Sequence, residues 1–296
     1  MLIRLTILPP RFWHMYRYLI AFSAAILSIS DPGIGGASLR AESPPWQSHL
    51  LTSPFQAQET SLRVLLPKLL KPATLYPCLF VLPVHQDGDF RHGDGLAEVL
   101  RLDIHNRYQV ICVAPSFTAE PWYVDHDENP SRRDESHLLE TVIPFIESRY
   151  SVRTDREGRF LVGFSKSGRG ALSLLLRHPD VFYKAVAWDP GIRIDMGPHG
   201  DQDETARKVR DRFGSQANYR QHQIPHLIRR FGRSLGEEAR LFYFNCEGVS
   251  RTAGGSTIHS LLVQEGVLHR YVLEANREHR WGSGWLPEAL LFLFPG

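Results

Sequence analysis

Two hydrophobic patterns alternate along the chain from Thr60 to the C-terminus. Short, nearly continuous apolar runs are typical of buried strands, and longer stretches with apolar residues every three or four positions are typical of helices. The predicted strands are 61–66, 76–84, 109–114, 159–163, 184–188, 240–245 and 268–273. The predicted helices are 95–106, 135–149, 168–177, 203–213, 224–234, 256–265 and 286–294, and Pro144 is expected to kink the second of them.

This alternation predicts an α/β fold. Strands that are apolar on both faces favour a mostly parallel sheet with helices covering both sides. Residues 190–236 interrupt the alternation with a charged, histidine-rich stretch. A long insertion after a strand end often covers a functional site. We therefore expect either a small cap or helices that simply pack on the surface.

The N-terminus has the pattern of a targeting segment. Arg4, Arg11 and Arg17 precede the apolar segment 18–29, and small residues follow at 35–37. This order predicts an export signal over residues 1–37. A single membrane anchor is the alternative, which the shortness of the apolar segment disfavours. Residues 38–58, rich in Ser, Pro and Gln, are expected to form a linker to a domain over 59–296 of a periplasmic or secreted protein.

Composition and charge narrow the function classes. The formal net charge of +2 would fall to zero if residues 1–37 were removed, which leaves no basic arm and makes nucleic acid a poor partner. Cys78, Cys112 and Cys246 each lie in an apolar run typical of a buried strand, without the spacing of a disulfide framework or a zinc site. We expect no metal and no cofactor. After removal of the signal we expect no stable membrane span, and the sequence does not indicate an oligomeric state.

The most informative segment is the turn Gly163-Phe164-Ser165-Lys166-Ser167-Gly168. It joins a predicted strand directly to a predicted helix. A serine at such a turn, with small residues two positions to either side, is typical of a nucleophile elbow. Ser167 stands where the G-x-S-x-G pattern has glycine. Ser165 is the candidate nucleophile, because choosing Ser167 would put Arg169 at a close-contact position; an ordinary glycine-rich turn is the alternative.

A serine nucleophile needs a histidine base and a carboxylate that orients the base. In elbow enzymes the chain order is serine, acid, histidine. His279 lies in the loop after the last predicted strand, where the base is expected. Asp189 directly follows the apolar run KAVAW, Glu247 directly follows the apolar run LFYFNC, and both fit this order. The tight turn after Asp189 favours it slightly, and the choice remains open at this point.

The oxyanion of the reaction needs two backbone N–H donors. We expect one from Lys166, which follows the nucleophile, and one from Val84, His85 or Gln86 in the loop after an early strand. We interpret the side chain of Lys166 as facing water, with a contact to an anionic substrate group as the alternative.

A second loop carries aromatic residues that suit a substrate pocket. Trp122 and Tyr123 follow another predicted strand end, where they would stack on a sugar or line an acyl pocket. The alternatives are a rigid loop packed on itself and an acidic cluster of the calcium type, whose ligand spacing follows no recognised pattern.

Three segments together carry a resemblance: LFVLPVH, GFSKSGRGALSLLLRHPDVF and HRWGSGW. From Thr60 onward the chain resembles the putative-esterase family of α/β-hydrolases, which includes esterase D and feruloyl and acetylxylan-type esterases. The resemblance implies an α/β-hydrolase fold and ester hydrolysis by a triad containing Ser165 and His279.

We therefore predict an exported serine esterase for an acylated carbohydrate or another small ester. Hydrolysis of S-formylglutathione, found in some relatives, is disfavoured by the export signal because that thiol ester is cytosolic. The alternative from another class is a non-catalytic protein that binds a glycan or a protein partner.

Overall fold

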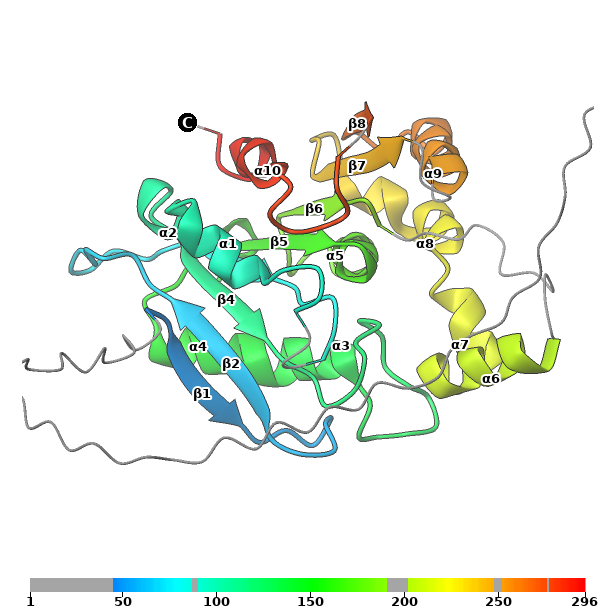
Figure 1. Ribbon diagram of the computed structural model, residues 1–296, viewed down its shortest axis with the longest axis horizontal. Coiled ribbons are helices and arrows are strands. Elements are labelled where there is room, and N and C mark those ends of the chain that lie inside the picture. Colours follow the sequence, from blue (N-terminus) through cyan, green and yellow to red (C-terminus); the bar gives the residue numbers. More distant parts are fainter. Residues whose placement is uncertain (1–44, 87–89, 191–201, 248–251, 276, 296) are drawn as a thin grey trace, which may run out of the picture. The chain divides into compact units, whose positions relative to one another are not determined.

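An eight-stranded sheet lies at the centre of the protein in the computed structural model, which describes residues 45–86, 90–190, 202–247, 252–275 and 277–295. Its order is β1-β2-β4-β3-β5-β6-β7-β8 (Figure 1). The strands are β1 (Gln47–Leu51), β2 (Thr60–Leu65), β3 (Cys78–Val81), β4 (Ile111–Pro115), β5 (Arg159–Phe164), β6 (Lys184–Trp188), β7 (Leu241–Glu247) and β8 (His269–Ala275).

The sheet is mostly parallel, which confirms the predicted fold. All strands from β4 to β8 in this order pair in parallel, whereas β1 and β2 form antiparallel pairs at one edge. Strand β1 corrects the sequence prediction, because it lies within residues 38–58, which we expected to be a linker. The Ser- and Gln-rich composition hid a strand of which only one residue, Leu51, is buried. The predicted export signal and the linker as far as residue 44 lie outside the described residues.

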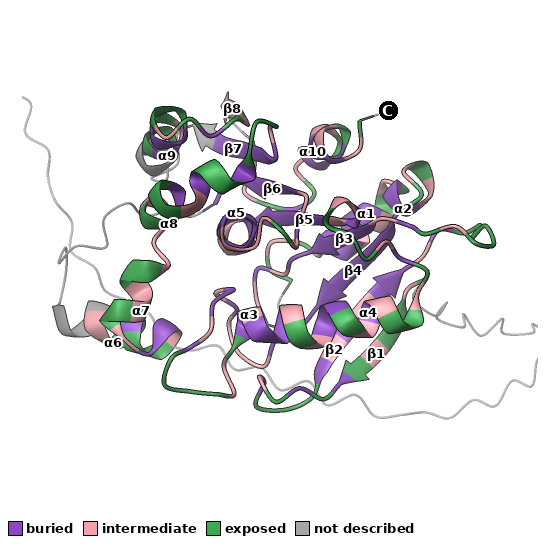
Figure 2. Cartoon of the chain, turned by 180° about the vertical axis from the view of Figure 1, so that it is seen from behind, coloured by how far each residue is buried: buried purple, intermediate pink, exposed green. Residues whose placement is uncertain are grey.

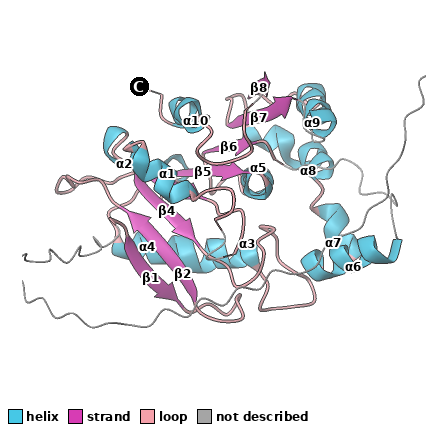
Figure 3. Cartoon of the chain, viewed as in Figure 1, coloured by secondary structure: helices cyan, strands magenta, loops and turns pink. Residues whose placement is uncertain are grey.

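Helices cover both faces of the sheet (Figures 1 and 3). One face carries α1 (Gly95–Arg101), α2 (Ile104–Arg107) and α10 (Leu286–Leu293). The other carries α3 (Asp134–Ser136), α4 (Ile143–Arg149), α5 (Lys166–Arg177), α8 (Ile224–Phe231) and α9 (Thr252–Gln264). Each face has its own apolar core, and the central strands are buried on both sides (Figure 2). No helix within the described ranges combines the length and apolar character needed to cross a membrane.

The kink expected at Pro144 takes the form of a π-helical turn. Residues His137–Val142 form this turn between α3 and α4, and Pro144 occupies the first turn of α4. Proline has no N–H with which to close the regular hydrogen bond to the preceding turn. The helix accommodates that missing donor with a wider turn just before it.

The insertion at 190–236 divides into two parts, and its residues 191–201 lie outside the described ones. Helix α8 is ordinary packing, because Ile224 and Leu227 are buried in the core beside α5. Helices α6 (Gln202–Phe213) and α7 (Gln216–Gln221) instead lie beside the loop between β4 and α3 (Figure 1). The Asn218 side chain of α7 donates to the backbone carbonyl of Asp125 in that loop at 2.8 Å.

Candidate active site

The sharp turn between β5 and α5 holds Ser165. Strand β5 ends at Phe164 and α5 begins at Lys166, so Ser165 is the only residue between them. Its φ of 54° and ψ of −124° are costly for a residue with a side chain. Its N–H donates to the carbonyl of Trp188 at the end of β6 at 2.9 Å, which ties the turn to the neighbouring strand. This strained strand-to-helix turn is the geometry of a nucleophile elbow.

The turn closes only because its flanking residues are small. A Cβ on Gly163 would lie 2.1 Å from the carbonyl oxygen of Ser167, far inside contact distance. Ser167 itself is buried, and its hydroxyl donates to the Phe164 carbonyl at 2.9 Å and accepts from the Phe164 N–H at 3.0 Å. A serine hydroxyl can do both at once. Ser167, which stands where the pattern has glycine, therefore stabilises the turn through two hydrogen bonds to the backbone of Phe164.

Three predicted residues meet at the carboxyl end of the sheet. The Nε2 atom of His279 lies 3.0 Å from the Oγ atom of Ser165. Its Nδ1 atom lies 2.5 Å from the Oδ2 atom of Asp189, whose side chain is fully buried. Asp189 follows β6 directly and its N–H donates to the Phe244 carbonyl of β7. The two nitrogens of one imidazole thus join the serine to a buried carboxylate.

Aromatic packing holds His279 in this position. Its ring lies 4.4 Å from the ring of Phe164 and 6.0 Å from that of Trp188, measured between centroids. Two residues later, the N–H of Trp281 donates to the His92 carbonyl at 2.9 Å, and the indole of Trp281 is buried. The loop after β8 is therefore anchored to the loop before α1 immediately beyond His279.

Glu247, the competing carboxylate, is the last residue of β7 and pairs with Ala275 in the backbone register. Its side chain lies outside the described part of the chain. The structure thus brings Asp189 to the imidazole and describes no contact for the other candidate.

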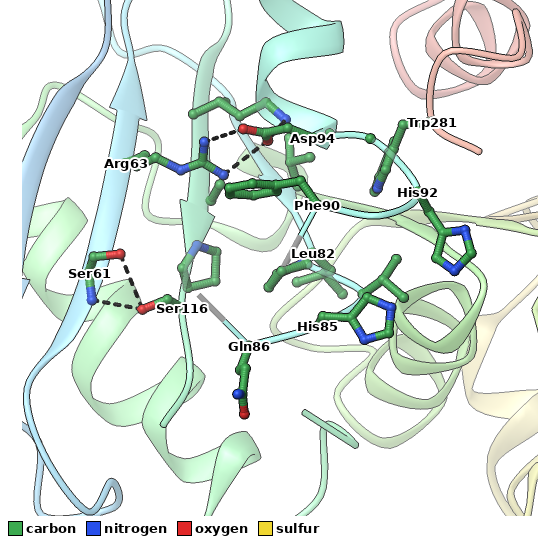
Figure 4. A pocket seen from close by; sticks show the side chains of 18 residues that line it. Ser61, Arg63, Leu82, His85, Gln86, Phe90, His92, Asp94, Ser116 and Trp281 are labelled. Carbon is green, nitrogen blue, oxygen red and sulfur yellow. Dashed lines mark hydrogen bonds and ion pairs between the residues drawn. The ribbon is translucent and has the colours of Figure 1, made fainter. Parts of the chain in front are cut away.

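The predicted oxyanion donors lie on two elements. Lys166 begins α5, where the first backbone N–H groups of a helix have no partner within it. Val84, His85 and Gln86 follow β3 and line a pocket of about 30 Å³ between that loop, β2 and β4 (Figure 4). This pocket is lined by neither Ser165 nor any residue bonded to its hydroxyl, so it is a neighbour of the site and does not contain it.

The side chain of Lys166 corrects the sequence interpretation, which placed it in water. Its Nζ atom forms an ion pair with Glu120, and only 13% of the side chain is exposed. Glu120 also accepts a hydrogen bond from Nδ1 of His85 at 3.0 Å. One carboxylate therefore joins the first residue of α5 to the loop after β3. Sequence reasoning missed Glu120, because a single glutamate in a loop carries no signal of its partners.

Of the two predicted aromatic residues, Tyr123 belongs to the core. It is fully buried, and its hydroxyl donates to the carbonyl of Pro83. A Cβ on Gly170 of α5 would lie 2.2 Å from its ring. Tyr123 therefore packs α5 against the loop after β3, and the prediction that it contacts substrate is wrong.

Trp122 is half-buried and has a different environment. Its indole ring lies near Lys166, Arg169 and Arg212. The backbone N–H groups of Trp122 and Tyr123 both donate to Asp134, at 2.7 and 3.2 Å. Burial raises the pKa of the Asp134 carboxyl to about 7. In the described ranges no three histidine, cysteine or acidic side chains are grouped to hold a metal ion.

The sequence profile of the family described as "Putative esterase" matches residues 53–232, more than half of the chain. The chain belongs to this esterase family. It is a carboxylic ester hydrolase with the α/β-hydrolase fold, as predicted. The matched region contains the elbow and Asp189 and ends before His279.

Solved structures share the fold across most of their length. A ferulic acid esterase is 19% identical, with a TM-score of 0.64 over 84% of this chain and 97% of its own. An S-formylglutathione hydrolase from Staphylococcus aureus is 15% identical, with a TM-score of 0.66 over 84% and 98%. A ferulic acid esterase from Anaeromyces mucronatus is 18% identical, with a TM-score of 0.57 over 86% and 91%.

Proposed function

We propose that this esterase cleaves its substrate through a triad of Ser165, His279 and Asp189. The observation that carries the proposal is the continuous contact from serine hydroxyl to imidazole to buried carboxylate, at 3.0 and 2.5 Å. Such contacts are within the range that proton transfer requires. The buried carboxylate fixes the tautomer in which Nε2 accepts the serine proton.

The proposed reaction has two halves. The Ser165 oxygen attacks the ester carbonyl while Nε2 of His279 takes the hydroxyl proton. The backbone N–H of Lys166 and one from Val84–Gln86 stabilise the negative oxygen of the tetrahedral intermediate. Collapse of that intermediate releases the alcohol, which receives the proton from His279. Water, activated by the same imidazole, then hydrolyses the acyl-enzyme and restores the serine.

We further propose that the enzyme is exported and acts on acylated carbohydrate or another small ester. The signal pattern in residues 1–37 supports export. The half-buried indole of Trp122 near the site and the ferulic acid esterases among the structural neighbours favour an ester with an aromatic or sugar component. The same signal argues against a cytosolic thiol ester. A reporter fused to residues 1–37 should leave the cytoplasm, and one that stays inside would overturn the proposed location.

Covalent labelling tests the triad. A fluorophosphonate should add once to the wild-type protein, as read by intact mass, and not at all to Ser165→Ala. His279→Ala should slow the labelling by orders of magnitude while the protein remains folded. Ser148→Ala removes an exposed hydroxyl on α4 and should label like the wild type. A folded wild-type protein that takes no label would contradict the assignment of Ser165 as the nucleophile and favour a binding protein with this fold.

A further inference from the structure

Three cationic side chains surround the indole ring of Trp122. The guanidinium carbon of Arg212 lies 4.4 Å from the ring centroid, that of Arg169 lies 5.9 Å away, and Nζ of Lys166 lies 5.5 Å away. They come from α5 and from α6 of the insertion, so two distant segments bring positive charge to one ring. Cations are attracted to the face of an indole, but that attraction neutralises no charge.

Only one of these cations has a carboxylate partner in the described part of the chain. Lys166 is paired with Glu120. Arg169 donates to the backbone carbonyl of His222 at 2.7 Å and forms no ion pair there. Arg212 forms none there either, and the neighbouring Asp211 pairs with Arg132 at 3.0 Å. Among the described side chains, two positive charges beside Trp122 are thus left without a carboxylate in ion-pair contact.

Burial also removes water from these charges, almost completely from Arg169 and in part from Arg212. Arg169 is only 7% exposed, and burial lowers the pKa of its guanidinium to about 10. Burial likewise lowers the pKa of Arg212. A desolvated charge without a counter-charge is unfavourable, and an anion that enters such a site offsets that cost. A guanidinium offers paired N–H donors that match the two oxygens of a carboxylate, sulfate or phosphate.

Arg169 stands on the helix that begins beside the nucleophile. The N–H of Arg169 donates to the carbonyl of Ser165 at 3.1 Å, so Arg169 is one helical turn, about 6 Å along the axis, beyond the nucleophile. Building on the function proposed above, we propose that Arg169, Arg212 and the face of Trp122 bind an anionic group of the ester substrate. The enzyme would then prefer esters that carry a carboxylate, sulfate or phosphate.

Matched ester pairs test this preference. On the acyl side, 4-nitrophenyl hemisuccinate is compared with 4-nitrophenyl pentanoate, and on the alcohol side, 4-acetoxybenzoate with its methyl ester. The ratio of kcat/KM for the anionic ester to kcat/KM for the neutral ester is measured in wild type and in Arg212→Gln. Arg212 is chosen because its side chain is partly exposed. We expect the ratio for at least one pair to fall about tenfold or more, the usual effect of losing a hydrogen bond to a charged group.

Controls separate this subsite from general charge effects. Arg220→Gln removes the same charge from an exposed position on α7 and should leave the ratio unchanged. Arg169→Gln should lower the ratio as Arg212→Gln does, provided that its melting temperature shows a folded protein. Sulfate, phosphate and succinate as inhibitors of the wild type identify which anion fits best, and their inhibition should weaken in Arg212→Gln.

Two outcomes contradict the proposal, and both differ from failure of the triad. Equal ratios in wild type and Arg212→Gln for both pairs would overturn it, as would a wild type that prefers the neutral member of each pair. In either case, labelling of Ser165 and hydrolysis of neutral esters would still support the triad. Loss of labelling in the wild type would instead remove the function on which the subsite rests.

Discussion

The two sides of Ser165 are built by different forces. On one side, which we call the packed side, Asp189 is fully buried and His279 is wedged between aromatic rings. On the other, the charged side, Glu120 pairs with Lys166 close to arginines that have no acidic partner in the described residues. Packing defines one geometry, whereas charges at a partly exposed surface adapt to what binds there and are screened by salt.

This difference separates rate from selectivity. A change on the packed side should disturb the proton transfer that every ester requires. A change on the charged side should alter which ester is preferred and leave the chemistry largely intact. The following variants test that division, from the largest expected effect to the smallest.

Asp189→Asn should cause the largest loss, a decrease in kcat of about 10⁴-fold on any ester. An asparagine can donate to Nδ1 of His279, which favours the tautomer whose Nε2 cannot accept the serine proton. The measurement is kcat on a neutral 4-nitrophenyl ester, with circular dichroism to establish folding. Glu247→Gln is the matched control and should stay within about threefold of wild type, because Asp189 already bonds the imidazole. The reverse ranking would make Glu247 the acid.

Asp134 should give a pH-dependent stability beneath the charged side. Its carboxyl has a pKa of about 7 in the folded protein, against an ordinary value of 3.8. Between these values the folded state keeps a proton that the unfolded state has lost, so stability from this group falls as pH rises. From pH 4.5 to 6.5 the contribution of this group to the free energy of unfolding should fall by about 2 kcal/mol.

The measurement is urea unfolding of wild type and Asp134→Asn at both pH values. Asparagine is neutral and keeps an oxygen for the N–H of Trp122, so the stability advantage of wild type over the variant should shrink by that amount. Asp180→Asn, at an exposed position, controls for the loss of a carboxylate elsewhere. A difference that stays constant with pH would show that Asp134 ionises normally.

The packed side could be predicted from the sequence, and the charged side could not. Ser165, His279 and both candidate acids follow strands, and parallel strands end at the same edge of a sheet, so pattern alone predicted one site there. It left the choice between Asp189 and Glu247 open. Glu120 and Arg212 stand 92 positions apart in a loop and a helix whose relative placement depends on tertiary packing. Strand β1 was missed for a related reason, because an exposed edge strand shows little apolar pattern.

Ser167→Ala should destabilise the elbow by about 1–2 kcal/mol, because the buried N–H and carbonyl of Phe164 both lose a partner. Ser148→Ala is a matched control, since that hydroxyl also donates to a carbonyl three residues earlier but is exposed. Ser148→Ala should lower the free energy of unfolding by less than about 0.5 kcal/mol. Equal costs in thermal unfolding would mean that Ser167 does not hold the turn.

Glu120→Gln should give the smallest effect and the clearest contrast between the two sides. It keeps the size of the side chain between Lys166 and His85 but removes the negative charge and replaces one oxygen with an NH2 group. The ion pair with Lys166 therefore becomes a weaker hydrogen bond to a neutral oxygen. We expect kcat on a neutral ester to fall by no more than about tenfold, since the loop after β3 is held less firmly.

The same variant should increase the preference for anionic esters, because the charge of Lys166 is no longer offset. The ratio of kcat/KM for the anionic and neutral esters therefore rises in Glu120→Gln and falls in Arg212→Gln. Glu128→Gln, an exposed change in the same loop, should move neither quantity. If Glu120→Gln instead lowered kcat on both the anionic and the neutral ester by about 10⁴-fold, as Asp189→Asn should, Glu120 would act in the chemistry. The division between the packed and charged sides would then fail.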